Sequence, residues 1–170
     1  MRFRIPPNDG LLDWIADQAD PPVRRIWSRR RVPVDALRCH PDLCDRLESS
    51  ASGLPGVRLR YLVGLPVLLH ANGVAFAIAS GTTWIALRIP QIGQRAVIRS
   101  QWGRRGLDGE WVDVDPWITD LPAREGTSRL RGWTRAAHAH AGELWSRRSD
   151  RRAPSRWRPS TPPPSPRSHP

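Results

Sequence analysis

Apolar residues recur every three or four positions through the first third of the chain, which is the period of an amphipathic helix. Pro22, Pro41 and Gly53 fall where such helices begin or end. The pattern predicts three helical segments, over residues 11–19, 20–27 and 41–52.

At Val57 the apolar pattern changes to a period of two. Apolar residues alternate with arginines over 57–63, which predicts a strand with one buried face. Two apolar runs then flank Asn72-Gly73, and a third run over 84–89 stops at Pro90. Asn-Gly between apolar runs predicts a two-residue hairpin turn in which both central residues have positive φ. A four-stranded antiparallel meander is therefore expected over 57–89.

Beyond Pro90 we expect a turn of helix over 95–99, a glycine-rich loop over 103–109 and a fifth strand over 110–114. Thr127 or Ser128 is expected to cap a final helix, because apolar residues again recur at helical spacing as far as Trp145. Seven of the last 17 residues are proline, which predicts a disordered or polyproline-type tail.

Together these elements predict an α+β fold, with an antiparallel meander of four or five strands and helices packed on one face. The expected organisation is an N-terminal helical extension over 1–40, an α+β domain over 41–146, and a disordered, basic, proline-rich tail over 147–170.

The stretch from Tyr61 to Leu87 has no charged residue and is long enough to span a membrane as a helix. Pro66, Asn72-Gly73 and Ser80-Gly81 divide it into strand-sized pieces, so we expect no membrane span. The first residues lack an apolar signal-peptide core, and two cysteines are too few for a disulfide framework. A cytoplasmic location is therefore expected.

The formal net charge is +11, from 27 basic and 16 acidic residues, and every basic residue is arginine. Arginine donates to phosphate in a bidentate geometry and stacks on bases, so clusters of it are typical of nucleic-acid-binding proteins. The candidate binding residues are Arg24, Arg25, Arg29, Arg30, Arg31, Arg104, Arg105, Arg124, Arg129, Arg131, Arg135, Arg156, Trp157 and Arg158. The alternative is a solvated, arginine-rich surface that reflects coding bias, with aspartates neutralising the first cluster.

We find no catalytic or metal-binding motif. Cys39, His40 and Cys44 are close in sequence, but zinc needs three or four convergent ligands, and His138 and His140 lie on different sides of a helix. The sequence contains no Gly-x-Ser-x-Gly elbow and no phosphate-binding loop. We therefore predict no enzymatic activity, no catalytic residue, no metal and no cofactor, with an unrecognised active-site pocket as the alternative.

Several short apolar motifs of this chain resemble the MmcQ/YjbR-like family over roughly residues 40–145. The motifs are Leu54-Pro55-Gly56-Val57, Gly73-Val74-Ala75-Phe76-Ala77, Leu87-Arg88-Ile89-Pro90 and the Trp111-Val112 pair before the last helix. Ala136-Ala137 departs from the family's Ser-Tyr pair, and Val74 stands where a lysine is common. The resemblance implies a small α+β domain with a frataxin-like arrangement of layers, often described as DNA-binding.

Two kinds of partner remain after these exclusions. Nucleic acid is the first candidate, bound with low specificity through the arginine clusters and the basic tail. Another protein is the alternative, with exposed tryptophans such as Trp102 and Trp117 as the contact residues.

Overall fold

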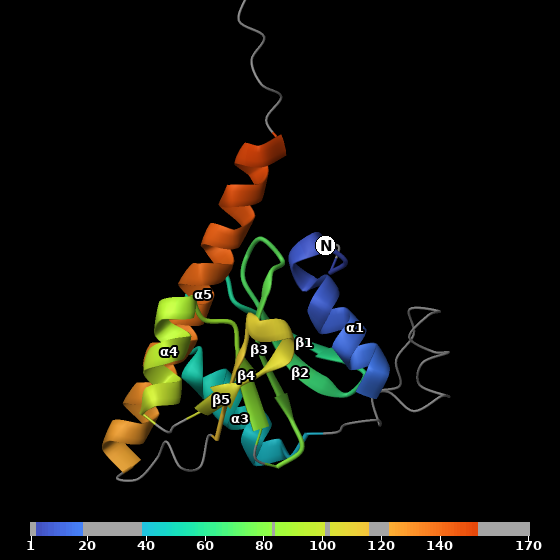
Figure 1. Ribbon diagram of the computed structural model, residues 1–170. Coiled ribbons are helices and arrows are strands. Elements are labelled where there is room, and N and C mark those ends of the chain that lie inside the picture. Colours follow the sequence, from blue (N-terminus) through green and yellow to red (C-terminus); the bar gives the residue numbers. More distant parts are fainter. Residues whose placement is uncertain (1–2, 19–38, 83, 101–102, 116–122, 153–170) are drawn as a thin grey trace, which may run out of the picture.

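The computed structural model describes residues 3–18, 39–82, 84–100, 103–115 and 123–152 (Figure 1). The described part of the chain confirms the predicted α+β class, and its sheet has six strands rather than four or five. All strand pairs are antiparallel, in the order β1-β2-β3-β4-β6-β5. The strands are β1 Arg58–Leu62, β2 Leu65–Leu69, β3 Ala75–Ser80, β4 Trp84–Leu87, β5 Gly103–Arg105 and β6 Val112–Val114. The helices are η1 Pro6–Asn8, α1 Asp9–Gln18, α3 Pro41–Ser50, α4 Gln91–Arg99, η2 Leu107–Gly109 and α5 Ala123–Arg152.

Helices cover both faces of the sheet. The expected layer is present on one face, where α3, α4 and α5 contribute Leu43, Val97 and Ala137 to one apolar core. On the other face, Leu11 and Ile15 of α1 join a second apolar core (Figure 1). The second layer arises because β2 is buried at every position and β3 at all but its last, so both faces of these strands need an apolar cover.

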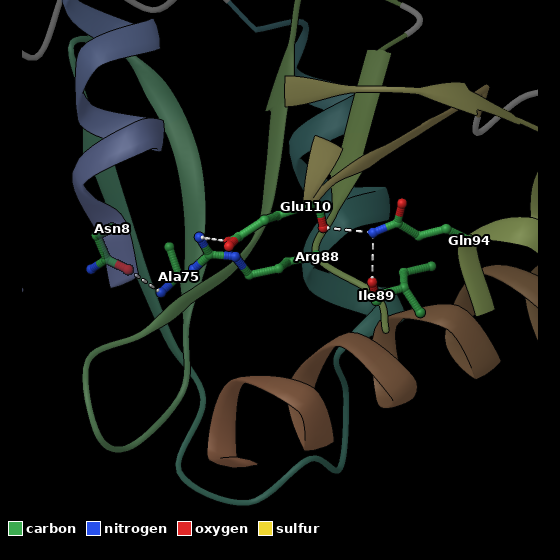
Figure 2. Close-up of polar contacts among 6 residues, drawn as sticks. All are labelled: Asn8, Ala75, Arg88, Ile89, Gln94 and Glu110. Carbon is green, nitrogen blue, oxygen red and sulfur yellow. Dashed lines mark hydrogen bonds and ion pairs between the residues drawn. The ribbon is translucent and has the colours of Figure 1, made fainter. Parts of the chain in front are cut away.

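A buried asparagine attaches the N-terminal segment to the sheet. The Nδ2 of Asn8 donates to the carbonyls of Phe3 and Gly73, at 2.9 Å each. Its Oδ1 accepts from the amide of Ala75 at 2.8 Å (Figure 2). Asn8 is completely buried, and it satisfies backbone groups at the start of β3 that would otherwise lack partners. Residues 3–18 are thus packed into the same unit as the sheet.

The expected glycine-rich loop is a strand and a turn, and this corrects the prediction for 103–109. Gly103 pairs with Val114, and a Cβ atom at Gly103 would lie 2.9 Å from Cγ1 of Val97. At Gly106 a Cβ atom would collide with the carboxylate of Asp113. The two glycines therefore permit close packing of β5 on β6 and α4. In the sequence, glycines that serve such packing look the same as glycines of a flexible loop. The expected turn of helix over 95–99 is the second half of the longer helix α4.

The predicted hairpin at Asn72-Gly73 is present, but its turn differs from the expected one. The amide of Gly73 donates to the carbonyl of His70 at 2.8 Å, and the amide of His70 donates to the carbonyl of Val74 at 2.9 Å. Only Gly73 has positive φ, at 91°, so the loop has three residues and ends in a glycine bulge. The side-chain Oδ1 of Asn72 accepts from the amide of Val74 at 2.9 Å, which stabilises this loop locally.

The two-residue turn with positive φ at both positions lies one hairpin earlier. Val63 and Gly64 have φ of 54° and 78°, and Leu62 pairs with Leu65 on either side of them. A β-branched residue is disfavoured in this conformation, so no local residue pattern predicted the turn. Val63 is 2% exposed and packs in the α1-side core, which offsets the backbone strain.

The last helix begins earlier than its expected caps. It starts at Ala123, so Thr127 and Ser128 lie within it, and its backbone continues to Arg152. Leu130, Ala137 and Ala141 are buried as the pattern predicted, whereas Trp145 is 42% exposed rather than part of the core. The short helix expected over 20–27 and most of the proline-rich tail lie outside the described residues.

The uncharged stretch from Tyr61 to Leu87 forms most of strands β1 to β4. None of the described helices combines the length and the apolar character that crossing a membrane requires.

Candidate nucleic-acid interface

Four exposed arginines lie on two neighbouring elements, helix α4 and the edge strand β5. On α4, Gln94 and Val97 face the protein, which turns Arg95 and Arg99 to solvent because residues three and four apart share a face. Strand β5 is the last strand of the sheet and packs against α4. Its Arg104 and Arg105 are also exposed. We call Arg95, Arg99, Arg104 and Arg105 the basic edge.

Most of the positive charge of the basic edge is not neutralised locally. Arg104 is the exception, because its Nε lies 3.5 Å from Oδ2 of Asp113. The Arg104 side chain is nevertheless 81% exposed, so this pair is screened by water and weak. Arg95, Arg99 and Arg105 form no ion pair with any other residue in the described part of the chain. Three guanidinium groups are thus available to bind an anion.

Asp113 lies beneath the basic edge, on β6. Burial raises the pKa of its carboxyl, and the hydrogen bonds from Trp84 and Arg104 together with the charge of Arg104 act in the opposite direction. Its side chain is 14% exposed. The carboxylate is therefore held below the surface, where it competes little with an external phosphate for the other three arginines.

The region around α3 and β1 carries charges of both signs. Helix α3 exposes Asp42, Asp45 and Glu48. It lies near β1, the first strand of the sheet, where the pKa of Tyr61 is raised first by burial and then by Cys44 and Glu48 of α3. Strand β1 exposes Arg58 and Arg60, so the acidic residues of α3 lie near arginines as well.

The structure brings only two of the predicted arginines into the basic edge, Arg104 and Arg105. On α5, Arg131 and Arg135 are exposed on the flank that carries His138, whereas Arg129 lies about 160° around the axis from Arg131. These three do not form one patch. The remaining predicted residues, Arg24, Arg25, Arg29, Arg30, Arg31, Arg156, Trp157 and Arg158, lie outside the described residues, as does the side chain of Arg124. Trp102 and Trp117, the expected protein-contact residues, lie there too.

Arg95 and Arg99 were missed in the sequence. Two features of the sequence could have indicated them: their spacing of four residues, and the lack of any acidic residue from 49 to 107 that could neutralise their charge. Once 91–99 is treated as a full helix, that spacing places both guanidinium groups on one exposed face.

The arginine at the end of β4 is structural. Arg88 is 2% exposed, its Nη2 donates to Oε2 of Glu110 at 2.6 Å, and its guanidinium lies 5.1 Å from the Trp111 ring centre (Figure 2). Gln94 supports the same corner, because its Nε2 donates to the carbonyls of Ile89 and Glu110 at 2.8 and 2.9 Å (Figure 2). A buried cation is tolerated when it is paired in this way. Arg88 thus belongs to the packing between α1 and the sheet.

The described residues include the two cysteines and most of the candidate metal ligands. Among them, no three His, Cys, Asp or Glu side chains are grouped as metal ligands would be. Cys39 lies just before α3 and Cys44 lies on it, and both are buried free thiols. Burial, followed by a hydrogen bond with Cys44, raises the pKa of Cys39 to about 12. The thiol is thus neutral at physiological pH and a poor nucleophile.

Comparison with models of known families, with curated proteins and with solved structures finds no match. The resemblance to the MmcQ/YjbR-like family therefore stays a prediction.

Proposed function

We propose that this chain is a cytoplasmic, non-enzymatic protein that binds the nucleic-acid backbone through the basic edge. The observation that carries the proposal is that four exposed arginines lie on the neighbouring elements α4 and β5, three of them without an ion pair among the described residues. Guanidinium groups bind phosphate oxygens in a bidentate geometry, and phosphate contacts supply most of the affinity in low-specificity binding.

The geometry favours backbone contacts over sequence reading. Contacts to phosphate position a protein on nucleic acid but carry no sequence information. The arginines of β5 also have a structural explanation, because charged side chains on an edge strand prevent pairing with other chains. That explanation does not extend to Arg95 and Arg99, which lie on a helix. The arginines of α4 are therefore the stronger support for binding.

A salt titration with matched variants tests the proposal. The triple variant R95Q/R99Q/R105Q removes the three arginines, and R60Q/R131Q/R135Q removes three exposed arginines elsewhere with the same change in charge. Each phosphate contact contributes about 0.7–0.9 to the slope of log affinity against log salt. We expect the first triple variant to lower the slope by about two to three, and the control to change it much less. Equal losses in both variants, or no binding by the wild type at low salt, would reject the basic edge as the binding surface.

A protein partner is the second candidate, and one exposed side chain favours it. Ile92 is 82% exposed on α4, one turn before Arg95 and Ala96. An apolar residue between arginines suits a protein interface better than a phosphate backbone. The variant I92Q distinguishes the two, because it should leave nucleic-acid affinity unchanged but weaken association with a protein. A salt-independent affinity that is lost in I92Q would favour the protein partner.

A further inference from the structure

Two histidines meet where α5 packs on the β2–β3 hairpin. The ring centres of His70 and His138 are 4.6 Å apart, and the ring of Phe76 lies edge-on to His138 at 5.3 Å. His138 is 8% exposed. The contact is close on the helix side as well, because a Cβ atom at Gly142 would lie 3.5 Å from Nε2 of His70. The two rings thus form part of the packing between the hairpin and α5.

The hydrogen bonds of both rings fit neutral imidazoles. The Nδ1 of His70 accepts from the amide of Asn72 at 3.2 Å, so Nδ1 carries no proton. The Nε2 of His138 lies 3.1 Å from the carbonyl of Pro55, which only accepts, so Nε2 carries the proton. This arrangement also argues against a shared metal ion, because neutral His70 would bear its proton on the nitrogen that faces α5.

No carboxylate among the described contacts compensates a charge at this position. The hairpin contributes His70, the turn at Pro55 contributes only its carbonyl, and β3 contributes Phe76. From α3, the uncharged Ser50 accepts a hydrogen bond from Thr134 at 3.0 Å. On α5 itself, Arg135 and Arg131 lie on the same flank as His138 and add positive charge. The ion pair of His140 with Glu143, at 3.9 Å, lies on the far flank of the helix.

We propose that His70 and His138 form a proton-sensitive clasp, which holds the middle of α5 on the hairpin only while both rings are neutral. Protonation of both would place two cations in ring contact and remove the acceptor that His70 offers to Asn72. Asn72 also donates through Nδ2 to the carbonyl of Ala141 at 3.1 Å, so a disturbance of the loop reaches α5 directly. The clasp is independent of the function proposed for the basic edge.

The electrostatic environment sets the direction of the effect. Burial lowers the pKa of His138 below the ordinary 6.5, the neighbouring His70 lowers it further, and the Pro55 carbonyl opposes this. The unfolded chain therefore takes up the proton at a higher pH than the folded chain. The contribution of His138 to stability is complete above pH 6.5 and is lost as the pH falls through the lower, folded-state pKa.

Proton titration of the full chain by NMR tests the clasp directly. We expect His138 to titrate below pH 6.5, and its pKa to rise in H70N, which keeps an acceptor for the Asn72 amide but cannot carry a charge. The control H40N alters an exposed histidine at the start of α3 and should leave the titration of His138 unchanged. A wild-type pKa of His138 at or above 6.5, or one that H70N does not alter, would overturn the proposal.

Hydrogen exchange supplies the structural readout. Protection of the α5 amides around His138, corrected for intrinsic exchange, should fall by up to about tenfold per pH unit below 6.5 in the wild type. H138Q retains a donor for the Pro55 carbonyl, and we expect it to remove most of this pH dependence. If H138Q does not fold, H70N should weaken the pH dependence in part, because burial, the larger cause of the lowered pKa of His138, remains. An unchanged pH dependence in the folded variant would show that the clasp does not hold α5.

Discussion

Val63 is the one non-glycine residue with positive φ in the described part of the chain, and its burial explains why the conformation is tolerated. The left-handed conformation costs an L-residue about 1–2 kcal/mol. Full burial of a valine side chain contributes about 1.5–3 kcal/mol, so burial outweighs the strain. Sequence patterns could not reveal this turn, because the gain comes from packing against α1, a segment remote in the chain.

At Gly73 no gain from side-chain burial offsets the strain of a positive φ, so a substitution should lower the stability of the fold. The φ of 91° is unfavourable for any side chain, and the residue is buried beside Asn8. We expect Gly73→Val to lower the free energy of unfolding by at least about 1–2 kcal/mol, measured by urea denaturation. The control is Gly132→Ala, on the exposed side of α5 with open space around it, which should raise stability by about 0.5–1 kcal/mol. Equal stability of the Gly73→Val variant and the wild type would contradict the observed turn.

At the scale of elements, the sequence predicted the pieces whose signals are local. The 41–52 helix, the meander and the final helix follow from apolar spacing, and Asn72-Gly73 correctly marked a hairpin. Strand β5 and the full length of α4 were missed. Gly103 and Gly106 serve close packing against β6 and α4, and glycines used for packing cannot be distinguished from loop glycines by local composition.

One side chain, Asn8, hydrogen-bonds the N-terminal segment to the sheet, in addition to the apolar contacts of Leu11 and Ile15. Removing the side chain in Asn8→Ala would leave the buried amide of Ala75 and the carbonyl of Gly73 without the hydrogen bonds that Asn8 provides. Each unsatisfied buried group costs about 1–3 kcal/mol, so we expect Asn8→Ala to lower the free energy of unfolding by at least about 2 kcal/mol. Asn72→Ala serves as a comparison, because its loop is more exposed and its loss should be smaller. A neutral Asn8→Ala would mean that these hydrogen bonds contribute little to the stability of the domain.

For the whole molecule, charge at the candidate site was predictable only in part. Arg104 and Arg105 were identified from sequence, but their placement on a strand next to the helix of Arg95 and Arg99 depends on the pairing of β5 with β6 and its packing on α4. Counting arginines also grouped Arg129, Arg131 and Arg135, which helical geometry places on different flanks. Net charge along the chain says how much charge is present, whereas the fold decides which charges act together.

Deletion of residues 153–170 separates the contribution of the tail from that of the domain. The deletion removes three arginines and no acidic residue, which lowers the formal net charge from +11 to +8. Trp157 is the only large apolar residue in this segment, so we expect unfolding free energy to change by less than about 0.5 kcal/mol. Nucleic-acid affinity should fall moderately if the tail adds electrostatic attraction. A large loss of stability on thermal denaturation would instead show that the tail packs on the domain.

The most direct test of the proposed function is to locate the bound nucleic acid on the protein. Amide chemical shifts of the full chain, recorded during titration with a short oligonucleotide at low salt, report which elements it contacts. We expect the largest changes over α4 and β5, and very small changes over α3, whose exposed carboxylates repel phosphate. Changes centred on α3 or α1, or no change at any described residue, would contradict the assignment of the basic edge as the binding surface.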